Sequence, residues 1–212
     1  MRNTLAEPRV ADALDRMFAA AAGDDTIAAR VDGFGNTPQE HADAAEEIYM
    51  PISPEAGRLL YSLVRAIRPA TVVEFGMSFG ISTLHLAAAV RDNGTGRVIT
   101  TELSAHKIAA ARRTFAETGL AEVITVLEGD ALRTLADLPD KPGFVLLDGW
   151  KDLYLPVLRM LEPRLDPGTL VVADDVELES VQPYLAYVRE PGNGYACVTF
   201  PVEDGLEISC RL

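Results

Sequence analysis

Short runs of β-branched and aliphatic residues recur from Ala70 to the end of the chain, separated by stretches with helical periodicity. Five of these runs are TVVEF, RVITTE, EVITVLE, GFVLLD and TLVVAD. Apolar runs separated by helices are typical of parallel strands that are covered by helices on both faces of the sheet. The last two runs, YACVTFPV and LEISCRL, are separated only by Glu-Asp-Gly at 203–205, which indicates a hairpin. We therefore predict an α/β fold whose seven-stranded sheet has five parallel strands and a C-terminal antiparallel hairpin.

The residues before this alternation contain three predicted helices with recognisable boundaries. Between Glu7 and Ala22, apolar residues recur at helical spacing until Gly23 interrupts the pattern. The pairs Thr37-Pro38 and Ser53-Pro54 each place a capping hydroxyl before a proline, which fits the first position of a helix. Residues 1–50 are therefore expected to form a helical N-terminal cap on a core of residues 51–212, within a single domain.

Composition limits the partners that this chain can have. The 19 basic and 32 acidic residues give a net charge of -13, and no cluster of lysine and arginine opposes it. Such a chain repels nucleic acid and anionic membranes. The two cysteines, Cys197 and Cys210, lack metal-type spacing and are expected to be reduced thiols. The N-terminus lacks the apolar core of a signal peptide, and no stretch approaches about 20 apolar residues. We therefore expect a soluble, cytoplasmic protein.

A glycine turn follows the first predicted strand and indicates a cofactor site. Glu74 precedes Gly76 and Gly80, and a helix is predicted from about Ile81. Glycine allows backbone to approach a ligand closely, in the crevice where open α/β sheets bind ligands. The spacing differs from the G-x-G-x-x-G of a dinucleotide site, and an acid here suits the ammonium of an amino-acid ligand. The next strand ends in Glu102, about 26 residues beyond Gly76, where a carboxylate can bind both ribose hydroxyls. This combination indicates S-adenosylmethionine.

Two other interpretations of the glycine turn fit the sequence less well. An ordinary β–α turn with a chance acid on the next strand does not explain the Gly129-Asp130-Ala131 turn after the third strand. That turn places Asp130 where the adenine is expected. A nucleotide-dependent oxidoreductase is disfavoured by Glu74 and by the missing third glycine.

Acidic residues follow two neighbouring predicted strands. Asp148 ends the fourth strand, and Asp174 and Asp175 end the fifth. Because the carboxyl ends of parallel strands meet at one edge of a sheet, the three side chains should converge. Oxygen ligands without cysteine or histidine suit Mg²⁺, Mn²⁺ or Ca²⁺ better than zinc. The alternative is that Asp148 and Asp175 cap the helices expected from about residues 152 and 177.

Lys151 has two possible roles. Beside a metal and a sulfonium it would be driven towards its neutral form and could act as a general base. Alternatively it forms a surface ion pair with Asp152. Of the histidines, His85 is expected to be packed in a helix, whereas His41 and His106 fall on polar faces, and none is expected to be catalytic.

Four segments resemble the class I O-methyltransferases of the catechol and caffeoyl-CoA type. These segments are VVEFGMSFGIS, LLDGWKDLYLPVL, VVADDV and VEDGLEIS. The resemblance covers about residues 50–212, and its most specific part is Asp-x-Trp-Lys-Asp-x-Tyr at 148–154. It implies a Rossmann-like sheet with helices on both faces, a methyltransferase domain over residues 1–212 and a catalytic core at 51–212. It also implies S-adenosylmethionine as cofactor, one divalent cation and a small-molecule acceptor.

The resemblance assigns roles to particular residues. Asp148, Asp174 and Asp175 would bind the cation, Lys151 and Asp148 would be catalytic, and Trp150 would flank the adenine. The expected cofactor-binding residues are Met50, Glu74, Gly76, Ser78, Gly80, Ser82, Glu102, Leu103, Asp130, Ala131, Asp148 and Trp150.

The chain departs from the family pattern at three positions. Asp175 stands where asparagine is usual, and its extra negative charge should tighten cation binding. Gly149 stands where the catechol enzyme has histidine, and Thr199 falls where that enzyme has the glutamate that grips the second catechol hydroxyl. These differences leave the identity of the acceptor open.

The predicted function is a divalent-cation-dependent transfer of the methyl group of S-adenosylmethionine to a hydroxyl of a small acceptor with vicinal oxygens, such as a catechol-like ring. A metal-independent N- or O-methyltransferase is the first alternative, and a cofactor-binding module without catalysis is the second. The sequence leaves monomer and homodimer open.

Overall fold

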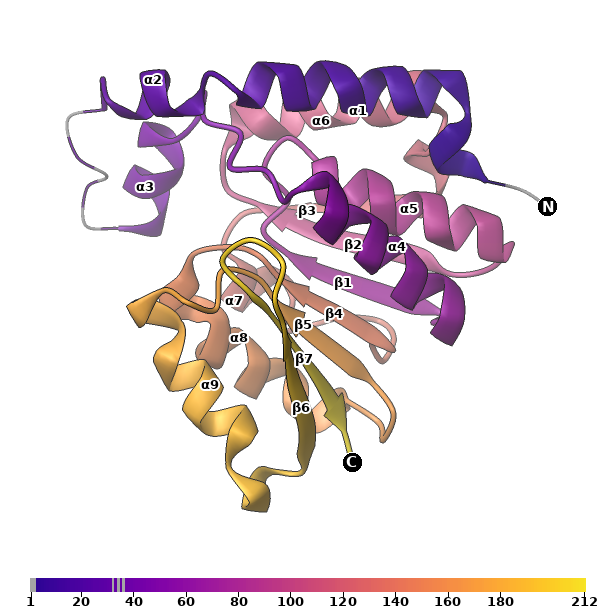
Figure 1. The fold of residues 1–212 in the computed structure, drawn as a ribbon, viewed down its shortest axis with the longest axis vertical. Helices are drawn as coiled ribbons and strands as arrows, with labels where there is room; N and C mark the ends of the chain where they lie inside the picture. Colours follow the sequence, from indigo (N-terminus) through magenta and orange to yellow (C-terminus); the bar gives the residue numbers. More distant parts are fainter. Residues whose placement is uncertain (1–2, 32, 34, 36) are drawn as a thin grey trace.

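One twisted sheet organises the protein. The structure is a computed structural model that describes residues 3–31, 33, 35 and 37–212, so residues 1–2, 32, 34 and 36 of the predicted N-terminal cap lie outside the described residues. Over the described residues, seven strands form the sheet in the order β3-β2-β1-β4-β5-β7-β6 (Figure 1). The strands are β1 (Thr71–Phe75), β2 (Arg97–Glu102), β3 (Ile124–Glu128), β4 (Phe144–Leu147), β5 (Leu170–Ala173), β6 (Tyr195–Phe200) and β7 (Leu206–Arg211). Strands β1 to β5 are parallel, whereas β7 is antiparallel to both β5 and β6, which confirms the predicted fold.

Helices connect the strands and precede them. They are α1 (Pro8–Ala21), α2 (Asp24–Ala28), α3 (Pro38–Ala44), α4 (Pro54–Ile67), α5 (Ile81–Asn93), α6 (Ala105–Thr118), α7 (Ala131–Thr134), α8 (Tyr154–Leu161) and α9 (Gln182–Arg189). Both predicted threonine and serine caps are present: Thr37 accepts a hydrogen bond from the Glu40 N–H, and Ser53 accepts one from the Ala56 N–H. Proline occupies the first turn of both helices, as the sequence predicted.

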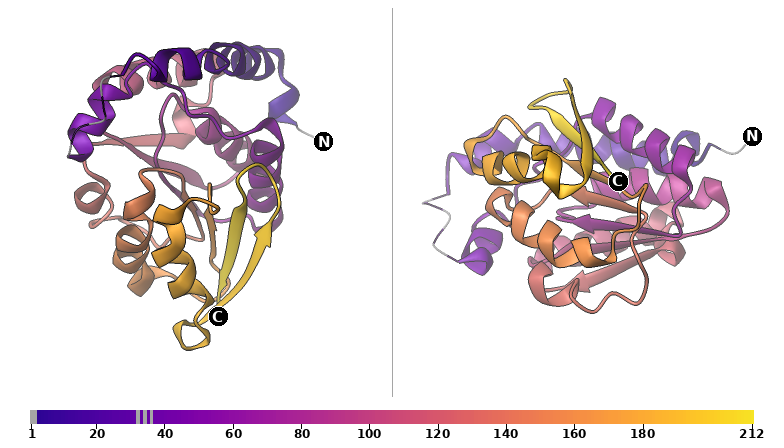
Figure 2. Two further views of the ribbon diagram at one scale, coloured as in Figure 1. Left: turned by 60° about the vertical axis from the view of Figure 1, so that its left-hand side comes forward. Right: turned by 90° about the horizontal axis from the view of Figure 1, so that it is seen from below.

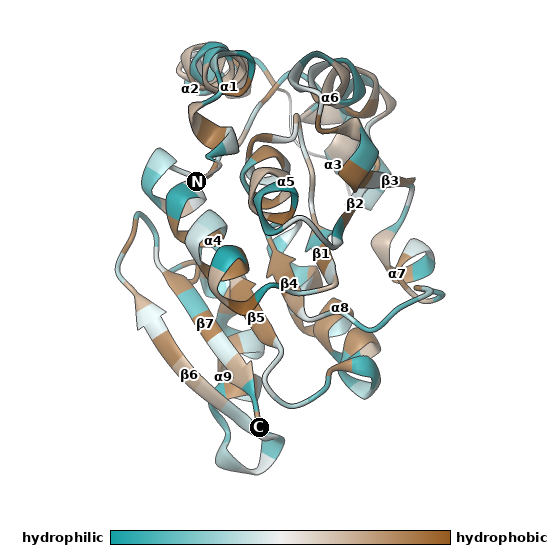
Figure 3. Ribbon diagram, turned by 90° about the vertical axis from the view of Figure 1, so that its right-hand side faces the viewer, coloured by the Kyte–Doolittle hydropathy of each residue, from teal (hydrophilic) through white to brown (hydrophobic). Residues whose placement is uncertain are grey.

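The helices cover both faces of the sheet, because successive side chains of a strand point to opposite faces. Val72 belongs to the hydrophobic layer formed with α1, α4, α5 and α6, whereas its neighbour Val73 belongs to the layer formed with α7, α8 and α9. Figure 2 shows the sheet between these two layers. In Figure 3 the strands in the middle of the sheet carry hydrophobic segments, whereas the helices around them also carry hydrophilic residues.

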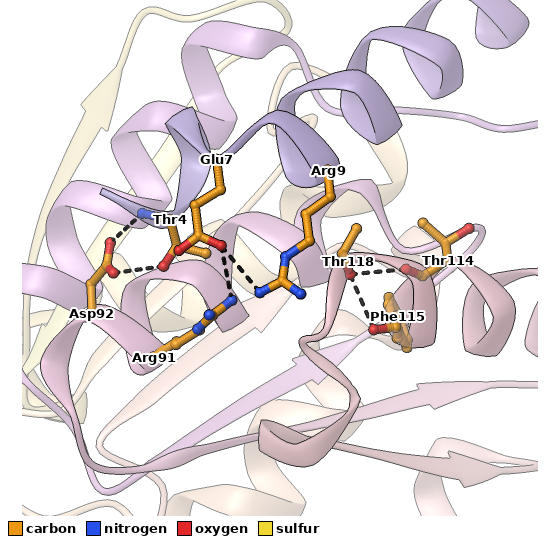
Figure 4. Close-up of polar contacts among 8 residues, drawn as sticks. All are labelled: Thr4, Glu7, Arg9, Arg91, Asp92, Thr114, Phe115 and Thr118. Atoms are coloured by element: carbon orange, nitrogen blue, oxygen red, sulfur yellow. Dashed lines mark hydrogen bonds and ion pairs between the residues drawn. The ribbon is translucent and has the colours of Figure 1, made fainter. Parts of the chain in front are cut away.

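The start of the chain is fixed to this core by polar contacts. The Asp92 carboxylate on α5 accepts hydrogen bonds from the Thr4 N–H at 2.9 Å and from the Thr4 hydroxyl at 2.6 Å (Figure 4). Glu7, just before α1, forms an ion pair with Arg91 at 3.3 Å. These contacts hold α1 beside α5 and α6, so the N-terminal helices have a defined position relative to the sheet.

The register of the parallel strands brings their carboxyl ends to one edge. Phe75 of β1 pairs with Thr101 of β2 and with Leu147 of β4, and Leu147 pairs with Ala173 of β5. The residues that follow each strand therefore meet at this edge, which is where open α/β sheets bind ligands. Among the helices of the described chain, none has the length and apolar character needed to cross a membrane.

Candidate active site

A cavity of about 420 Å³ opens at the carboxyl edge of the sheet. It is bounded by the loops after β1, β2, β3, β4 and β5, and by residues of the N-terminal segment. The predicted site residues that line it are Met50, Gly76, Ser78, Ser82, Glu102, Leu103, Asp130, Ala131, Asp148, Trp150, Lys151, Asp174 and Asp175. The two predicted residues that do not line it are Glu74 and Gly80. The fold therefore brings all the predicted cofactor residues except Glu74 and Gly80 into one cavity with the three acids.

The Glu102 carboxylate is held rigidly at the end of β2. Its Oε2 accepts a hydrogen bond from the Ser78 N–H at 2.8 Å, and its Oε1 accepts from the N–H groups of Leu103 and Ser104 at 2.8 and 2.9 Å. Three backbone donors thus fix the orientation of one carboxylate. Such a fixed acceptor suits a pair of hydroxyl groups on a ligand.

Glycine is required at the two predicted positions, 76 and 80, for different structural reasons. Gly76 has a φ of 97°, and a Cβ there would lie 2.5 Å from the backbone oxygen of Asp148. This glycine lets the loop after β1 pack directly against the loop after β4. Gly80 has a φ of 94°, precedes α5, and would direct a Cβ at the ring of Phe115 instead of the cavity. Its role in the structure is packing.

Glu74 differs from its predicted position. Its side chain is fully buried, and its Oε2 accepts hydrogen bonds from the hydroxyls of Thr83 and Thr100. The other oxygen, Oε1, is buried and has no hydrogen-bond partner among the described residues. Burial raises the pKa of Glu74, although the neighbouring hydroxyls lower it. Because alternate residues of β1 face opposite sides, Glu74 lies on the same face as Val72, beneath α5, and its carboxylate does not line the cavity.

The three acids converge as predicted from the ends of β4 and β5. Ligand oxygens of Asp148, Asp174 and Asp175 lie within 4.8 Å of one another. The capping alternative is wrong, because the turns at Lys151–Leu153 and Glu179–Val181 follow Trp150 and Leu178 and have no side-chain caps. Burial, with repulsion from neighbouring carboxylates, raises the pKa of Asp148 to about 7 and that of Asp174 to about 8. The cluster therefore carries more negative charge than its surroundings stabilise.

Lys151 lies inside this cluster. Its Nζ is 2.7 Å from an Asp175 oxygen and 3.4 Å from an Asp148 oxygen, and it donates a hydrogen bond to the Tyr154 hydroxyl at 2.8 Å. The alternative of a surface pair with Asp152 is therefore wrong. Burial lowers the pKa of Lys151, but Tyr154, Asp148 and Asp175 outweigh it, so the pKa is raised well above its ordinary value. The expected drive towards the neutral form is thus opposed by the protein's own carboxylates.

The departures from the family pattern have structural explanations. A Cβ at Gly149 would lie 2.5 Å from the ring of Phe75, so the Phe75 ring fills the space that a larger residue would need. Thr199 does not line the cavity. Its hydroxyl donates to Glu207 at 2.6 Å and accepts from Arg189 at 2.9 Å on the outer hairpin.

Several residues near the cavity were not predicted. His41 of α3 meets the Trp150 ring edge to face, with centroids 5.1 Å apart, and Tyr49 stacks on Phe79 at 4.0 Å. Lys107 of α6 also lines the cavity.

The expectation that His85 is packed is confirmed, since it is buried and its Nδ1 lies 2.9 Å from the Ile81 carbonyl oxygen. Asp130 accepts a hydrogen bond from the Leu132 N–H and so also caps α7.

The fold and the cavity together define a class of protein. The strand order, the glycine turn after β1 and the carboxylate at the end of β2 are those of the class I S-adenosylmethionine-dependent methyltransferases. Residues 73–176 match a family described as a methyltransferase domain.

Comparison with known proteins narrows this class. The chain is 31% identical to catechol O-methyltransferase B of Danio rerio over 186 residues, which cover 82% of this chain and 70% of that protein. It is 30% identical to catechol O-methyltransferase of Sus scrofa over 176 residues, or 76% of this chain and 93% of that protein. The chain belongs to the family of S-adenosylmethionine-dependent O-methyltransferases.

A solved structure supports the fold. The O-methyltransferase from Bacillus cereus in complex with SAH aligns with a TM-score of 0.69, at 18% identity, over 92% of this chain and 100% of that chain. The enzyme class also implies a small-molecule acceptor, consistent with the cavity's size.

Proposed function

We propose that this O-methyltransferase depends on a divalent cation and methylates a hydroxyl of a small acceptor with vicinal oxygens, such as a catechol-like ring. One observation carries the proposal. Three carboxylates from two strand ends lie within 4.8 Å of one another, in the cavity that Glu102 and the glycine turn also line. Two adjacent acceptor oxygens would bind a cation at such a cluster by chelation.

The chemistry of the acid cluster fits a hard cation. All three side chains offer carboxylate oxygens, and the cluster found in the described chain contains neither cysteine nor histidine. Mg²⁺, Mn²⁺ and Ca²⁺ prefer such ligands. Burial and repulsion between the carboxylates raise the pKa values of Asp148 and Asp174, and a bound cation would stabilise their charged forms. When bound, the cation would lower the pKa of an acceptor hydroxyl.

The cofactor would occupy the other half of the cavity. We assign the ribose hydroxyls to Glu102, whose carboxylate is already fixed by three backbone donors. Trp150 would flank the adenine. His41 of α3, in the predicted N-terminal cap, packs against the Trp150 ring and would hold it in place. The remaining predicted contacts would come from the loops after β1 and β3 and from Met50, all of which line the cavity.

Lys151 is assigned the transfer of the acceptor's proton. Its Nζ lies between Asp175 and the Tyr154 hydroxyl, in the part of the cavity formed by the acids. Because Asp148 and Asp175 are among the groups that raise its pKa, positive charge bound by them would lower it. The chain's own contribution is to hold both reactants in line, which replaces a bimolecular encounter by an effectively unimolecular step.

A panel of ortho-diols with labelled S-adenosylmethionine, assayed with Mg²⁺ and with EDTA, tests this proposal. We expect Mg²⁺-dependent methylation of at least one ortho-diol, and loss of the rate in Asp174→Asn. The control is Asp166→Asn, which removes an exposed carboxylate paired with Lys141. Activity that survives EDTA would favour a metal-independent enzyme. Binding of the cofactor with no turnover on any ortho-diol would contradict the proposed acceptor class.

A further inference from the structure

Lys107 is a buried cation in the cofactor half of the cavity. It belongs to α6, lines the cavity and is only 4% exposed. Within the described chain its Nζ forms no ion pair; it donates a hydrogen bond to the Ser78 hydroxyl at 3.1 Å and lies 5.5 Å from the centre of the Phe79 ring. Burial lowers the pKa of Lys107, whereas the charges of Glu102 and Asp24 raise it. Burying an ammonium is costly, so this placement requires a compensating function or contact.

The contact that Lys107 makes fixes the direction of another hydrogen bond. The Ser78 hydroxyl donates its single hydrogen to the Tyr49 carbonyl oxygen at 2.7 Å. It therefore accepts from Lys107. The Ser78 N–H donates to Glu102 at 2.8 Å. Ser78 also has a φ of 48°, a left-handed conformation that is strained for a residue other than glycine. Contacts on both its hydroxyl and its N–H thus hold Ser78 in a strained position.

The other end of this network is held by Asp24. Its two carboxylate oxygens accept hydrogen bonds from the Tyr49 N–H at 2.9 Å and the Met50 N–H at 2.8 Å. Tyr49 is therefore bound on one side through its N–H to Asp24 and on the other through its carbonyl to Ser78. Lys107 contributes the only positive charge among these groups, and it acts on both Asp24 and Glu102.

We propose that Lys107 is a positioning residue for the cofactor. It fixes Ser78, and through Ser78 it holds both the ribose-binding carboxylate of Glu102 and the Tyr49–Met50 segment against the cavity. This inference rests on the proposed cofactor role of Glu102. Lys107 itself would make no direct contact with the cofactor. Its replacement should therefore weaken the binding of any ligand that contains the adenosine moiety.

Calorimetric binding of two ligands to Lys107→Met tests the proposal. S-adenosylhomocysteine carries an amino-acid carboxylate, whereas 5′-methylthioadenosine has the same nucleoside without it. Loss of a hydrogen bond from a charged donor is worth about 1.5 kcal/mol or more, so we expect the Kd of both ligands to rise about tenfold or more. The KM for S-adenosylmethionine should rise equally, with kcat within about twofold, because the Lys107 ammonium is bound to Ser78 in the cofactor half of the cavity.

The matched control is Lys141→Met, an exposed lysine whose Nζ pairs with Asp166 at 2.6 Å. It removes the same charge and should leave both Kd values unchanged. An unchanged Kd in folded Lys107→Met would overturn the proposal. A loss confined to S-adenosylhomocysteine would also overturn it, because the ammonium would then bind the amino-acid carboxylate directly.

Two further variants test whether Lys107 acts through Ser78 and whether the proposed cofactor site itself is correct. Ser78→Ala retains the ammonium and should weaken both ligands, with no further loss in the double variant if Lys107 acts through Ser78. Additive losses would overturn this route. Glu102→Gln should weaken both ligands if the cofactor site is correct. If Glu102→Gln binds as the wild type does, the proposed cofactor site fails, whereas an unchanged Lys107→Met alone overturns only the positioning role.

Discussion

Replacement of Gly149 by alanine tests the packing that supports Lys151. A Cβ at Gly149 would lie 2.5 Å from Cζ of Phe75 and within 2.8 Å of two further ring atoms. The Phe75 ring is 5% exposed and meets the Tyr154 ring edge to face, with centroids 6.3 Å apart. The Tyr154 hydroxyl in turn accepts a hydrogen bond from Lys151. A displaced Phe75 ring would therefore disturb the position of Lys151.

The expected magnitude follows from the contacts. Overpacking of a buried site costs about 1–3 kcal/mol. The φ of Gly149 lies outside the left-handed region, so alanine has no backbone strain there and instead gains about 0.4–1 kcal/mol from the unfolded state. The net loss in the free energy of unfolding should be about 1–2 kcal/mol. In Phe75→Leu the ring is removed, and the added methyl gains room. The double variant should therefore lose less than the sum of the two single losses, by about 1 kcal/mol.

Urea unfolding of the four proteins measures this coupling, and methyl-transfer rates report on Lys151. The control is Gly192→Ala, because a Cβ at Gly192 meets no atom within 4 Å and its φ is not positive. That variant should be as stable as the wild type or slightly more stable. Wild-type stability in Gly149→Ala, or strictly additive losses in the double variant, would refute the packing argument.

Three further predictions follow from charge and hydrogen bonding. Because the pKa values of Asp148 and Asp174 are raised, to about 7 and about 8, the cation-free folded protein binds more protons than the unfolded chain; its free energy of unfolding should fall between about pH 4 and pH 8. Asp174→Asn should flatten this profile in urea titrations with EDTA, and an equally steep profile would contradict the assignment. Asp92→Ala should cost about 3 kcal/mol and abolish hydrogen-exchange protection near Thr4, because three hydrogen bonds are lost, two from Thr4 and one from the Tyr61 hydroxyl. Lys151→Met should lower kcat about 100-fold with an unchanged Kd for S-adenosylhomocysteine, and a wild-type kcat would exclude proton transfer by Lys151.

The fold could be predicted because its signals are local. The TVVEF and RVITTE runs match β1 and β2 residue for residue, and the hairpin signal at 203–205 matches the turn between β6 and β7. The third run shows the limit of this pattern. Its first residues, Glu122 and Val123, belong to a 3₁₀ turn at Ala121–Val123, and β3 begins at Ile124. Apolar character alone does not fix where hydrogen bonding to the next strand starts.

The site could be predicted only where strand ends determine it. Asp148, Asp174 and Asp175 meet because parallel strands share an edge, and this needs no knowledge of tertiary packing. Lys107 reaches the cavity from α6, and Asp24 of α2 binds the N–H groups of Tyr49 and Met50, which line it. The partners of both residues are distant in the chain. Their convergence depends on how helices pack, which the sequence pattern does not specify. The face of the sheet on which Glu74 lies could be predicted from the sequence, since it follows from the alternation of side chains along β1.

The two lysines of the cavity show how local contacts decide whether the pKa of an ammonium group rises or falls. Lys151 lies 2.7 Å from Asp175 and 3.4 Å from Asp148, and these carboxylates outweigh burial and raise its pKa. The Lys107 ammonium donates to the Ser78 hydroxyl and has no ion pair among the described residues, so burial prevails and lowers its pKa. Lys151 is thus controlled by the carboxylates of the acceptor half, whereas Lys107 is controlled by burial and by its hydrogen bond to Ser78 in the cofactor half. Substitution of Lys107 should therefore appear in cofactor affinity and substitution of Lys151 in turnover. A crossed result would show that the cavity is not divided in this way.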